Sequence, residues 1–168
     1  MGNLSNFLAP AVGNLSRWLL CHRALAHGWD VSTFHSSCGH KSHTVTLIKN
    51  DQYVFGGYTD IPWEPFEAYG TTPDAFIFSL RNKEELHPFK SMVLKSEYAI
   101  FKRSTYGPTF GNGWDIHISN NSNSNNESYT KFAVDGYYER PEKVQDLTTI
   151  LAGTFYFSPT DWEVFYLG

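Results

Sequence analysis

Histidine and cysteine side chains concentrate in one short part of the chain, residues 21–43. Five of the seven histidines and both cysteines fall there. Within it His35, Cys38, His40 and His43 lie inside nine residues, and all four side chains are of types that bind zinc. Recognised zinc motifs instead pair two close ligands with two distant ones, so that a loop folds around the ion. The spacing therefore favours surface histidines and buried thiols over a metal centre, and we expect no cofactor.

Other catalytic arrangements have weaker support in the sequence. A cysteine–histidine nucleophile pair within residues 21–43 is conceivable, but no third group can be named to orient it. The G-x-S-x-G elbow of serine hydrolases is absent, and the adjacent carboxylates of Glu84 and Glu85 lie in a turn-like, solvated segment. We predict that the chain is not an enzyme. The alternative is a redox- or metal-dependent enzyme that uses residues 21–43.

Two adjacent glycines stand in the stretch DQYVFGGYTDIPW, residues 51–63. A phosphate-binding loop needs a longer glycine-rich turn followed by the N-terminus of a helix. Here Gly57 is followed by YTDIP, without a Lys-Ser or Lys-Thr pair, and Pro62 is unsuited to a helix interior. The glycines are therefore predicted to lie in a strand, where a ring or another backbone approaches closely.

Length and composition limit the classes of protein. The 168 residues indicate one domain with its own core, and the aromatic content of 17% suits half-buried sheet surfaces. A formal charge of -4 gives no long-range attraction to nucleic acid, so no nucleic-acid partner is expected. Polar residues and Pro10 interrupt the N-terminal segment, which argues against direct insertion into a membrane. Two cysteines are too few for a disulfide framework in a chain of this size. We expect a cytoplasmic monomer.

Runs of alternating apolar and polar residues predict antiparallel strands. They occur at residues 44–49, 52–59, 74–80, 98–102, 114–119, 129–134 and 162–167. One short helix is expected over VSTFHSS, residues 31–37, where Asp30 would cap its start and Gly39 would end it. The predicted fold class is mainly β with short helices (α+β), in which two antiparallel sheets pack as a β-sandwich flanked by helices.

Three further expectations concern order and burial. Residues 1–17 are expected to form a weakly ordered lead-in, and the polar segment NNSNSNNES, residues 120–128, a flexible hairpin tip. Six strand residues are expected to face the core: Phe55, Phe76, Phe78, Ile100, Ile116 and Val164. A shift of one residue in strand phase would turn such side chains to the opposite face of their sheet.

Five motifs follow one another along residues 18–168. They are WLLCHRALAHGWDVSTFHSSC, HTVTLIKNDQYVFGGYTDIPW, YGTTPDAFIFSL, YGPTFGNGWDIHI and DWEVFYL. In this order and with these gaps the sequence resembles the TLDc domain family, so residues 18–168 are identified as a TLDc-like domain. The resemblance implies a two-sheet β-sandwich flanked by short helices. It also implies that LLCHRA forms a strand and that VSTFHSS forms the helix after it.

The resemblance implies protein binding rather than catalysis. TLDc proteins are linked to resistance to oxidative stress and to binding the cytosolic sector of the vacuolar proton-pumping ATPase (V-ATPase). By resemblance, Gly57, Gly111 and Gly113 match family glycines associated with that interaction, and Glu163 matches the acidic residue of the closing motif. Backbone shape at turns and bulges explains such glycines equally well. A domain with this role is expected in the cytoplasm, peripheral to endolysosomal membranes.

Overall fold

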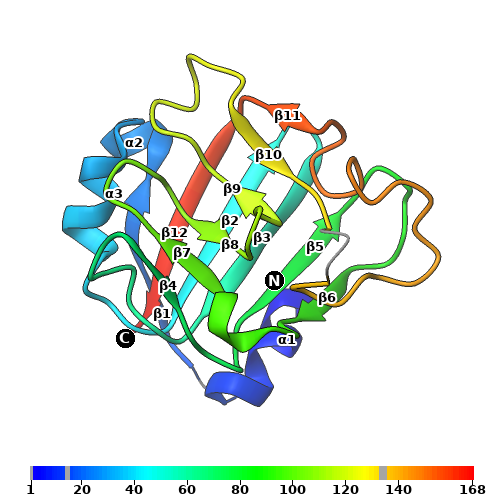
Figure 1. The fold of residues 1–168 in the computed structure, drawn as a ribbon, viewed down its shortest axis with the longest axis horizontal. Coiled ribbons are helices and arrows are strands. Elements are labelled where there is room, and N and C mark those ends of the chain that lie inside the picture. Colours follow the sequence, from blue (N-terminus) through cyan, green and yellow to red (C-terminus); the bar gives the residue numbers. More distant parts are fainter. Residues whose placement is uncertain (1, 14–15, 133–135) are drawn as a thin grey trace.

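Two six-stranded antiparallel sheets form the body of the domain (Figure 1). The structure is a computed structural model that describes residues 2–13, 16–132 and 136–168. The sheets overlap in the view of Figure 1, and short helices lie at the ends of the strands. The predicted two-sheet β-sandwich flanked by helices is therefore confirmed. Each of the seven predicted strand runs contains a strand, although residues 133–134 of the run 129–134 lie outside the described residues.

Sheet A contains the longest strands. In spatial order it consists of β1 (Trp18–Arg23), β12 (Asp161–Leu167), β2 (Thr44–Asn50), β3 (Tyr53–Thr59), β5 (Phe76–Arg81) and β6 (Phe89–Met92). The C-terminal strand β12 is inserted between β1 and β2, so that Val164 pairs with His22 on one side and with Thr46 on the other. The closing motif DWEVFYL is thus an interior strand, with partners along both of its edges.

Sheet B is built from shorter strands. In spatial order they are β11 (Tyr156–Phe157), β10 (Ser128–Thr130), β9 (Ile116–His117), β8 (Thr109–Phe110), β7 (Ile100–Lys102) and β4 (Ala68–Gly70). Strands β8 and β9 form a hairpin in which Phe110 pairs with Ile116. The loop of that hairpin contains residues 111–113 of the segment FGNG. A glycine-containing turn therefore stands directly beside the centre of sheet B.

Helices flank the sandwich at its ends and on one face. They are α1 (Gly2–Val12), α2 (Ala24–His27), α3 (Val31–Cys38) and the 3-10 turn η1 (Ser96–Tyr98). Asp30 caps α3, because its side chain accepts a hydrogen bond of 2.9 Å from the Ser32 amide, and Gly39 follows the last residue of the helix. Both helix signals in the sequence are therefore confirmed. Helices α2 and α3 lie together beside β1 (Figure 1).

The main core lies between the two sheets. All six residues expected in the core are buried, and Phe55, Ile100, Ile116 and Val164 belong to this main cluster. The prediction was wrong for the direction of Phe76 and Phe78, which face away from sheet B, while Ile77 between them faces it. The sequence FIF is apolar on both faces of β5, so alternation gave no sign of which face points inward.

Helix α1 covers the outer face of sheet A. Leu4 and Leu8 are 4% and 5% exposed and pack in a second cluster with Val45, Tyr58 and the outward rings of β5. The lead-in expected at residues 1–17 thus contains an 11-residue helix with an apolar contact stripe, at spacing i, i+4. Residues 1, 14 and 15 of that lead-in lie outside the described residues.

The asparagine-rich segment 120–128 is fastened to the body of the domain. Asn120 Oδ1 accepts a hydrogen bond of 2.9 Å from the Val31 amide, and the Asn121 amide donates one of 3.0 Å to the Trp29 carbonyl. Asn125 donates through its side chain to two backbone carbonyls of the same loop. Side-chain amides thus bond the loop backbone, which a composition-based expectation of flexibility does not take into account.

Gly56 and Gly57 lie in the interior of β3, as predicted for the glycine pair. A Cβ on Gly57 would stand between 2.5 and 2.8 Å from three ring carbons of Phe110, which belongs to sheet B and is fully buried. A Cβ on Gly56 would collide with the carbonyl oxygen of Thr46 on β2. The missing side chain of Gly57 therefore lets a ring from one sheet rest directly on the backbone of the other.

A double-mutant cycle tests this contact between the sheets. We expect Gly57→Ala to lower the free energy of unfolding by about 1–3 kcal/mol, because the buried Phe110 ring has no room to withdraw. In a Phe110→Leu background the same change is expected to cost less, since the shorter side chain leaves space for a methyl group. A coupling energy of about 0.5–3 kcal/mol, measured by chemical denaturation, would establish the contact. Strictly additive effects would contradict it.

Candidate functional site

The two cysteines are joined by a disulfide, Cys21–Cys38. The expectation of two buried thiols was therefore wrong. Cys21 lies on β1 and Cys38 is the last residue of α3, and the packing of α3 against β1 brings their Cα atoms to 5.6 Å. That separation is in the ordinary range for a disulfide. A sequence separation of 17 residues gave no sign of this approach, because it depends on how the helix folds back.

The structure does not gather His35, Cys38, His40 and His43 around one point. His35 is buried and donates from Nε2 to the Tyr106 carbonyl at 2.7 Å, His40 is exposed, and Nδ1 of His43 lies 2.9 Å from the Tyr58 hydroxyl. Cys38 is taken up by the disulfide. Across residues 2–13, 16–132 and 136–168, no group of three His, Cys, Asp or Glu side chains is arranged to hold a metal ion.

Two other histidines are buried inside aromatic surroundings. His22 is fully buried on β1, with its ring 4.6 Å from that of Trp162, and neither ring nitrogen has a hydrogen-bond partner among the described residues. His117 on β9 is 6% exposed, and its Nδ1 lies 3.0 Å from Thr109 Oγ1. Burial lowers the pKa of each ring to about 4, and for His22 repulsion from His27 adds to burial while Asp161 opposes it. Both histidines are therefore neutral at pH 7.

The residues matched to the family interaction do not form one surface. Gly57 is buried beneath Phe110, and Gly111 is buried with a φ of 84°, where an added Cβ would collide with the Asp115 side chain. Gly113 is exposed, with a φ of 89° and open space around it. Glu163 is half-buried on β12, where it lines a groove with Leu4 and other residues beneath α1. Gly113 and Glu163 thus belong to different sheets, and packing or backbone conformation accounts for the two buried glycines.

The outer face of sheet B carries a continuous layer of aromatic side chains, and one of them, Tyr137, also packs against the main core. We call it the outer aromatic cluster, and its members are linked by ring contacts of 4.6–6.4 Å: Tyr69, Tyr98, Phe101, Tyr106, Trp114, His117, Tyr129, Tyr137, Phe155 and Tyr156. Most of these rings are half-buried, and Tyr156 is 54% exposed. Strand alternation explains their placement, since Phe101, His117 and Tyr129 are sequence neighbours of buried residues.

This cluster is not visible in the sequence, because its members come from six separate segments. The only signal was the high aromatic content, 17% of the chain, which exceeds what the core alone uses. The FGNG loop borders the cluster: Tyr69 donates to Asn112 Oδ1 at 2.7 Å, and Asn112 Nδ2 donates to the Tyr137 hydroxyl at 3.3 Å. The Tyr129 hydroxyl lies 3.5 Å from the Gly113 carbonyl oxygen. The exposed glycine of that loop is therefore part of the rim of the aromatic face.

Cationic side chains lie over three rings of the outer aromatic cluster. The Arg103 guanidinium is 5.0 Å from the Tyr106 ring centroid, Lys95 Nζ is 4.7 Å from that of Tyr137, and Lys131 Nζ is 6.0 Å from that of Tyr129. Cations at this distance from a ring face are attracted by its quadrupole. Arg103 also has Glu67 within 3.6 Å, in an ion pair whose two side chains are both about half exposed. The rim of the cluster is therefore rich in positive charge.

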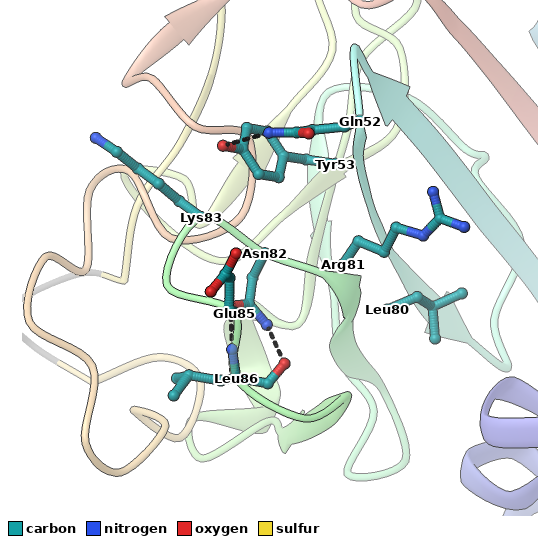
Figure 2. Close-up of a pocket in the computed structure, with 8 residues that line it drawn as sticks. All are labelled: Gln52, Tyr53, Leu80, Arg81, Asn82, Lys83, Glu85 and Leu86. Atoms are coloured by element: carbon teal, nitrogen blue, oxygen red, sulfur yellow. Dashed lines mark hydrogen bonds between the residues drawn. The ribbon is translucent and has the colours of Figure 1, made fainter.

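A separate polar hollow of about 320 Å³ lies where β3 begins and β5 ends (Figure 2). Asn82 bonds both the amide and the carbonyl of Leu86, so its side chain holds the following turn in shape. Arg81 and Lys83 extend in opposite directions from the end of the strand (Figure 2). Because these two cations diverge, the hollow lacks the converging charges that an anion site needs.

These features define a β-sandwich domain with a helix on the outer face of one sheet and aromatic rings on the outer face of the other. A model of the TLDc domain family matches residues 1–168, the whole chain, and the chain belongs to this family. The match includes residues 1–17, which precede the TLDc-like region identified from motifs. A comparison with curated proteins gives no match.

Within residues 2–13, 16–132 and 136–168, none of the helices combines the length and the apolar character that a membrane span needs.

The buried histidines predict sensitivity to mild acid. Their folded pKa of about 4 lies below the value of about 6.5 expected in the unfolded chain, so the unfolded state binds more protons once the pH falls below 6.5. The contribution that each neutral histidine makes to stability is therefore fully present above pH 6.5 and declines toward pH 4. Between pH 7 and pH 5.5, where ordinary carboxyl groups stay ionised, we expect each histidine to account for a loss of about 1 kcal/mol in the free energy of unfolding.

Chemical denaturation of two variants at both pH values measures this contribution. His22→Phe removes one titrating ring and two unpaired nitrogens, and is expected to flatten the dependence of stability on pH. His87→Gln, at an exposed position, is the matched control and should leave it unchanged. An unaltered pH dependence in His22→Phe would show that this ring is not held neutral by burial.

Proposed function

We propose that the chain is a non-catalytic protein-interaction domain that binds the cytosolic sector of the V-ATPase and contributes to resistance to oxidative stress. The observation that carries this proposal is the match of the TLDc domain family to the whole chain, residues 1–168. The domain would act as a monomer in the cytoplasm, peripheral to endolysosomal membranes. It would need neither nucleic acid nor insertion into the bilayer.

The placement of the titratable side chains supports a non-catalytic role. His22 and His117 are neutral and enclosed by rings, and the His35 ring is bonded to a backbone carbonyl. A general acid or base has to reach a substrate proton, and a nucleophile needs a base within hydrogen-bond distance. None of these three rings lines the polar hollow beside β3. The residues that line it belong to the start of β3, the end of β5 and the turn that follows β5.

The Cys21–Cys38 pair favours a second candidate, a redox enzyme that uses residues 21–43. A dithiol that cycles to a disulfide gives up two electrons and two protons, and such pairs serve as redox centres in reducing compartments. The metal-dependent form of this alternative has less support, because His35, Cys38, His40 and His43 are not brought together. A Cys21→Ser/Cys38→Ser variant discriminates the two candidates, since a binding domain should keep its partner while a redox enzyme should lose all activity.

Retention of the purified cytosolic sector of the V-ATPase on immobilised domain tests the proposed function. We expect the wild-type domain to retain the sector, and Gly113→Asn to weaken retention about tenfold at unchanged melting temperature. Glu163→Gln, on the outer face of sheet A, tests whether the matched acidic residue contributes to the same interface. Asparagine suits Gly113 because it tolerates positive φ better than other residues. Gly13→Asn is the matched control, since Gly13 is also exposed, has a positive φ (88°) and has no atom within 4 Å of an added Cβ.

Two outcomes would count against this account. Failure of the folded wild-type domain to retain the sector would overturn the proposed function. Retention that is unaffected by either variant would remove Gly113 and Glu163 from the interface, and would leave the family match as the support for binding.

A further inference from the structure

The two sheets differ in what covers their outer faces. On sheet A the apolar side chains of α1 fill this position, and α2 and α3 pack against β1 and β12 of the same sheet. On sheet B the corresponding face is the outer aromatic cluster, whose rings are half-buried against one another. Exposed groups of large aromatic side chains are the composition that distinguishes the centres of protein interfaces from ordinary surface.

Charge around the cluster indicates the chemistry of its partner. Lys95 and Lys131 each lie over a ring, and among the described residues neither has a carboxylate within salt-bridge distance. Arg103 has one exposed acidic neighbour, Glu67. The chain as a whole carries a formal charge of -4, so the charge of this rim is opposite in sign to the net charge of the protein. A partner that fits it brings negative charge together with apolar surface.

We infer that the outer aromatic cluster is a docking surface for an acidic segment of a partner protein that carries apolar side chains. Carboxylates of the segment would pair with Lys95, Arg103 and Lys131, and its apolar side chains would pack on the rings between them. The inference deepens the proposed function and rests on it, because it names the chemistry of the segment that a protein-interaction domain of this shape binds. Gly113 acquires a role here, because its carbonyl oxygen lies 3.5 Å from the Tyr129 hydroxyl and the space in front of its missing side chain is open to a partner.

Two other occupants fit the observations less well. Nucleic acid binding depends on neutralising many phosphates, whereas this rim has three cations on a protein of net negative charge. A second copy of the chain would meet the cluster about a two-fold axis, which places the same cations of both copies at one interface. Like charges brought together in this way oppose association. An acidic protein segment satisfies both the rings and the cations.

Selection from a displayed library of random dodecapeptides on the immobilised full chain tests the inference. We expect the enriched peptides to combine Asp or Glu with Leu, Ile, Met, Phe or Trp. The highest-ranking peptide is then synthesised with a fluorophore, and its dissociation constant is measured by fluorescence polarisation. Tyr156→Ser and Lys131→Glu are each expected to weaken binding about tenfold or more, and added salt should weaken it further.

The variants are chosen so that loss of binding differs from loss of folding. Tyr156 is exposed, and Lys131 contributes only its amide to the backbone hydrogen bonds, so both variants should keep the wild-type melting temperature. Lys49→Glu is the matched control, because Lys49 is an exposed cation on sheet A, and it should bind the peptide as the wild type does. Enrichment of basic or uncharged peptides, or equal binding by all variants, would overturn the inference.

Three further measurements separate the alternatives. Binding of a fluorescent dT12 oligonucleotide that Lys131→Glu abolishes would overturn the inference in favour of nucleic acid. A dimer in light scattering that Tyr156→Ser dissociates would overturn it in favour of a second copy.

If Lys131→Glu loses the peptide but retains the V-ATPase sector, the docking surface is not the pump interface and the inference fails while the proposed function stands. If the wild type binds acidic peptides but not the sector, the proposed partner is wrong and the surface chemistry stands.

Discussion

The backbone of Gly57 packs directly against the ring of Phe110, and the two sheets are arranged around this contact. Gly57 is in the middle of sheet A and Phe110 is in the middle of sheet B, so the contact sets how closely the two layers approach. The same ring packs edge-on against Trp63 at 5.4 Å and lies near Tyr138. A side chain on Gly57 would displace that ring and, with it, the hairpin that it begins.

The β8–β9 hairpin links the buried contact between Gly57 and Phe110 to the outer aromatic cluster. Phe110 is followed at once by the turn through Gly111, Asn112 and Gly113, and Asn112 bonds the hydroxyls of Tyr69 and Tyr137. Those two rings belong to the outer aromatic cluster. The chain therefore connects the core directly to the arrangement of the outer face of sheet B. On this view, the family glycines act at two levels: Gly57 and Gly111 shape the hairpin, and Gly113 borders the surface that the hairpin presents.

Much of the architecture could be predicted from the sequence, because the signals involved are local. The alternation of apolar and polar residues predicted the long strands, and Asp30 and Gly39 marked the limits of α3. The glycine pair predicted a strand position that another ring or backbone approaches closely. The direction of Phe76 and Phe78 was not predictable from β5 alone, since that strand is apolar on both faces and the outer one is covered by α1. The disulfide depended on how α3 folds back across β1, which has no local signal.

The outer aromatic cluster was beyond sequence reasoning for the same reason. Its rings come from strands and loops scattered between residues 69 and 156, and only the pairing of β4, β7, β9, β10 and β11 within sheet B brings them together. The Cys/His-rich segment stands out in the sequence because its residues are close together along the chain. In space they instead form a disulfide, a hydrogen bond to a backbone carbonyl and a contact with Tyr58. For this domain, spacing along the chain was a poor guide to which side chains act together.

We propose that sheet B, rather than the helix-covered sheet A, presents the surface that meets a protein partner. Amide hydrogen exchange of the domain, followed with and without the purified cytosolic sector of the V-ATPase, distinguishes the two faces. We expect the partner to slow exchange in residues 95–117 and 128–131, which carry most rings of the outer aromatic cluster and all three of its cations, and to leave α1 unchanged. Protection confined to α1 and the outer face of sheet A would contradict it.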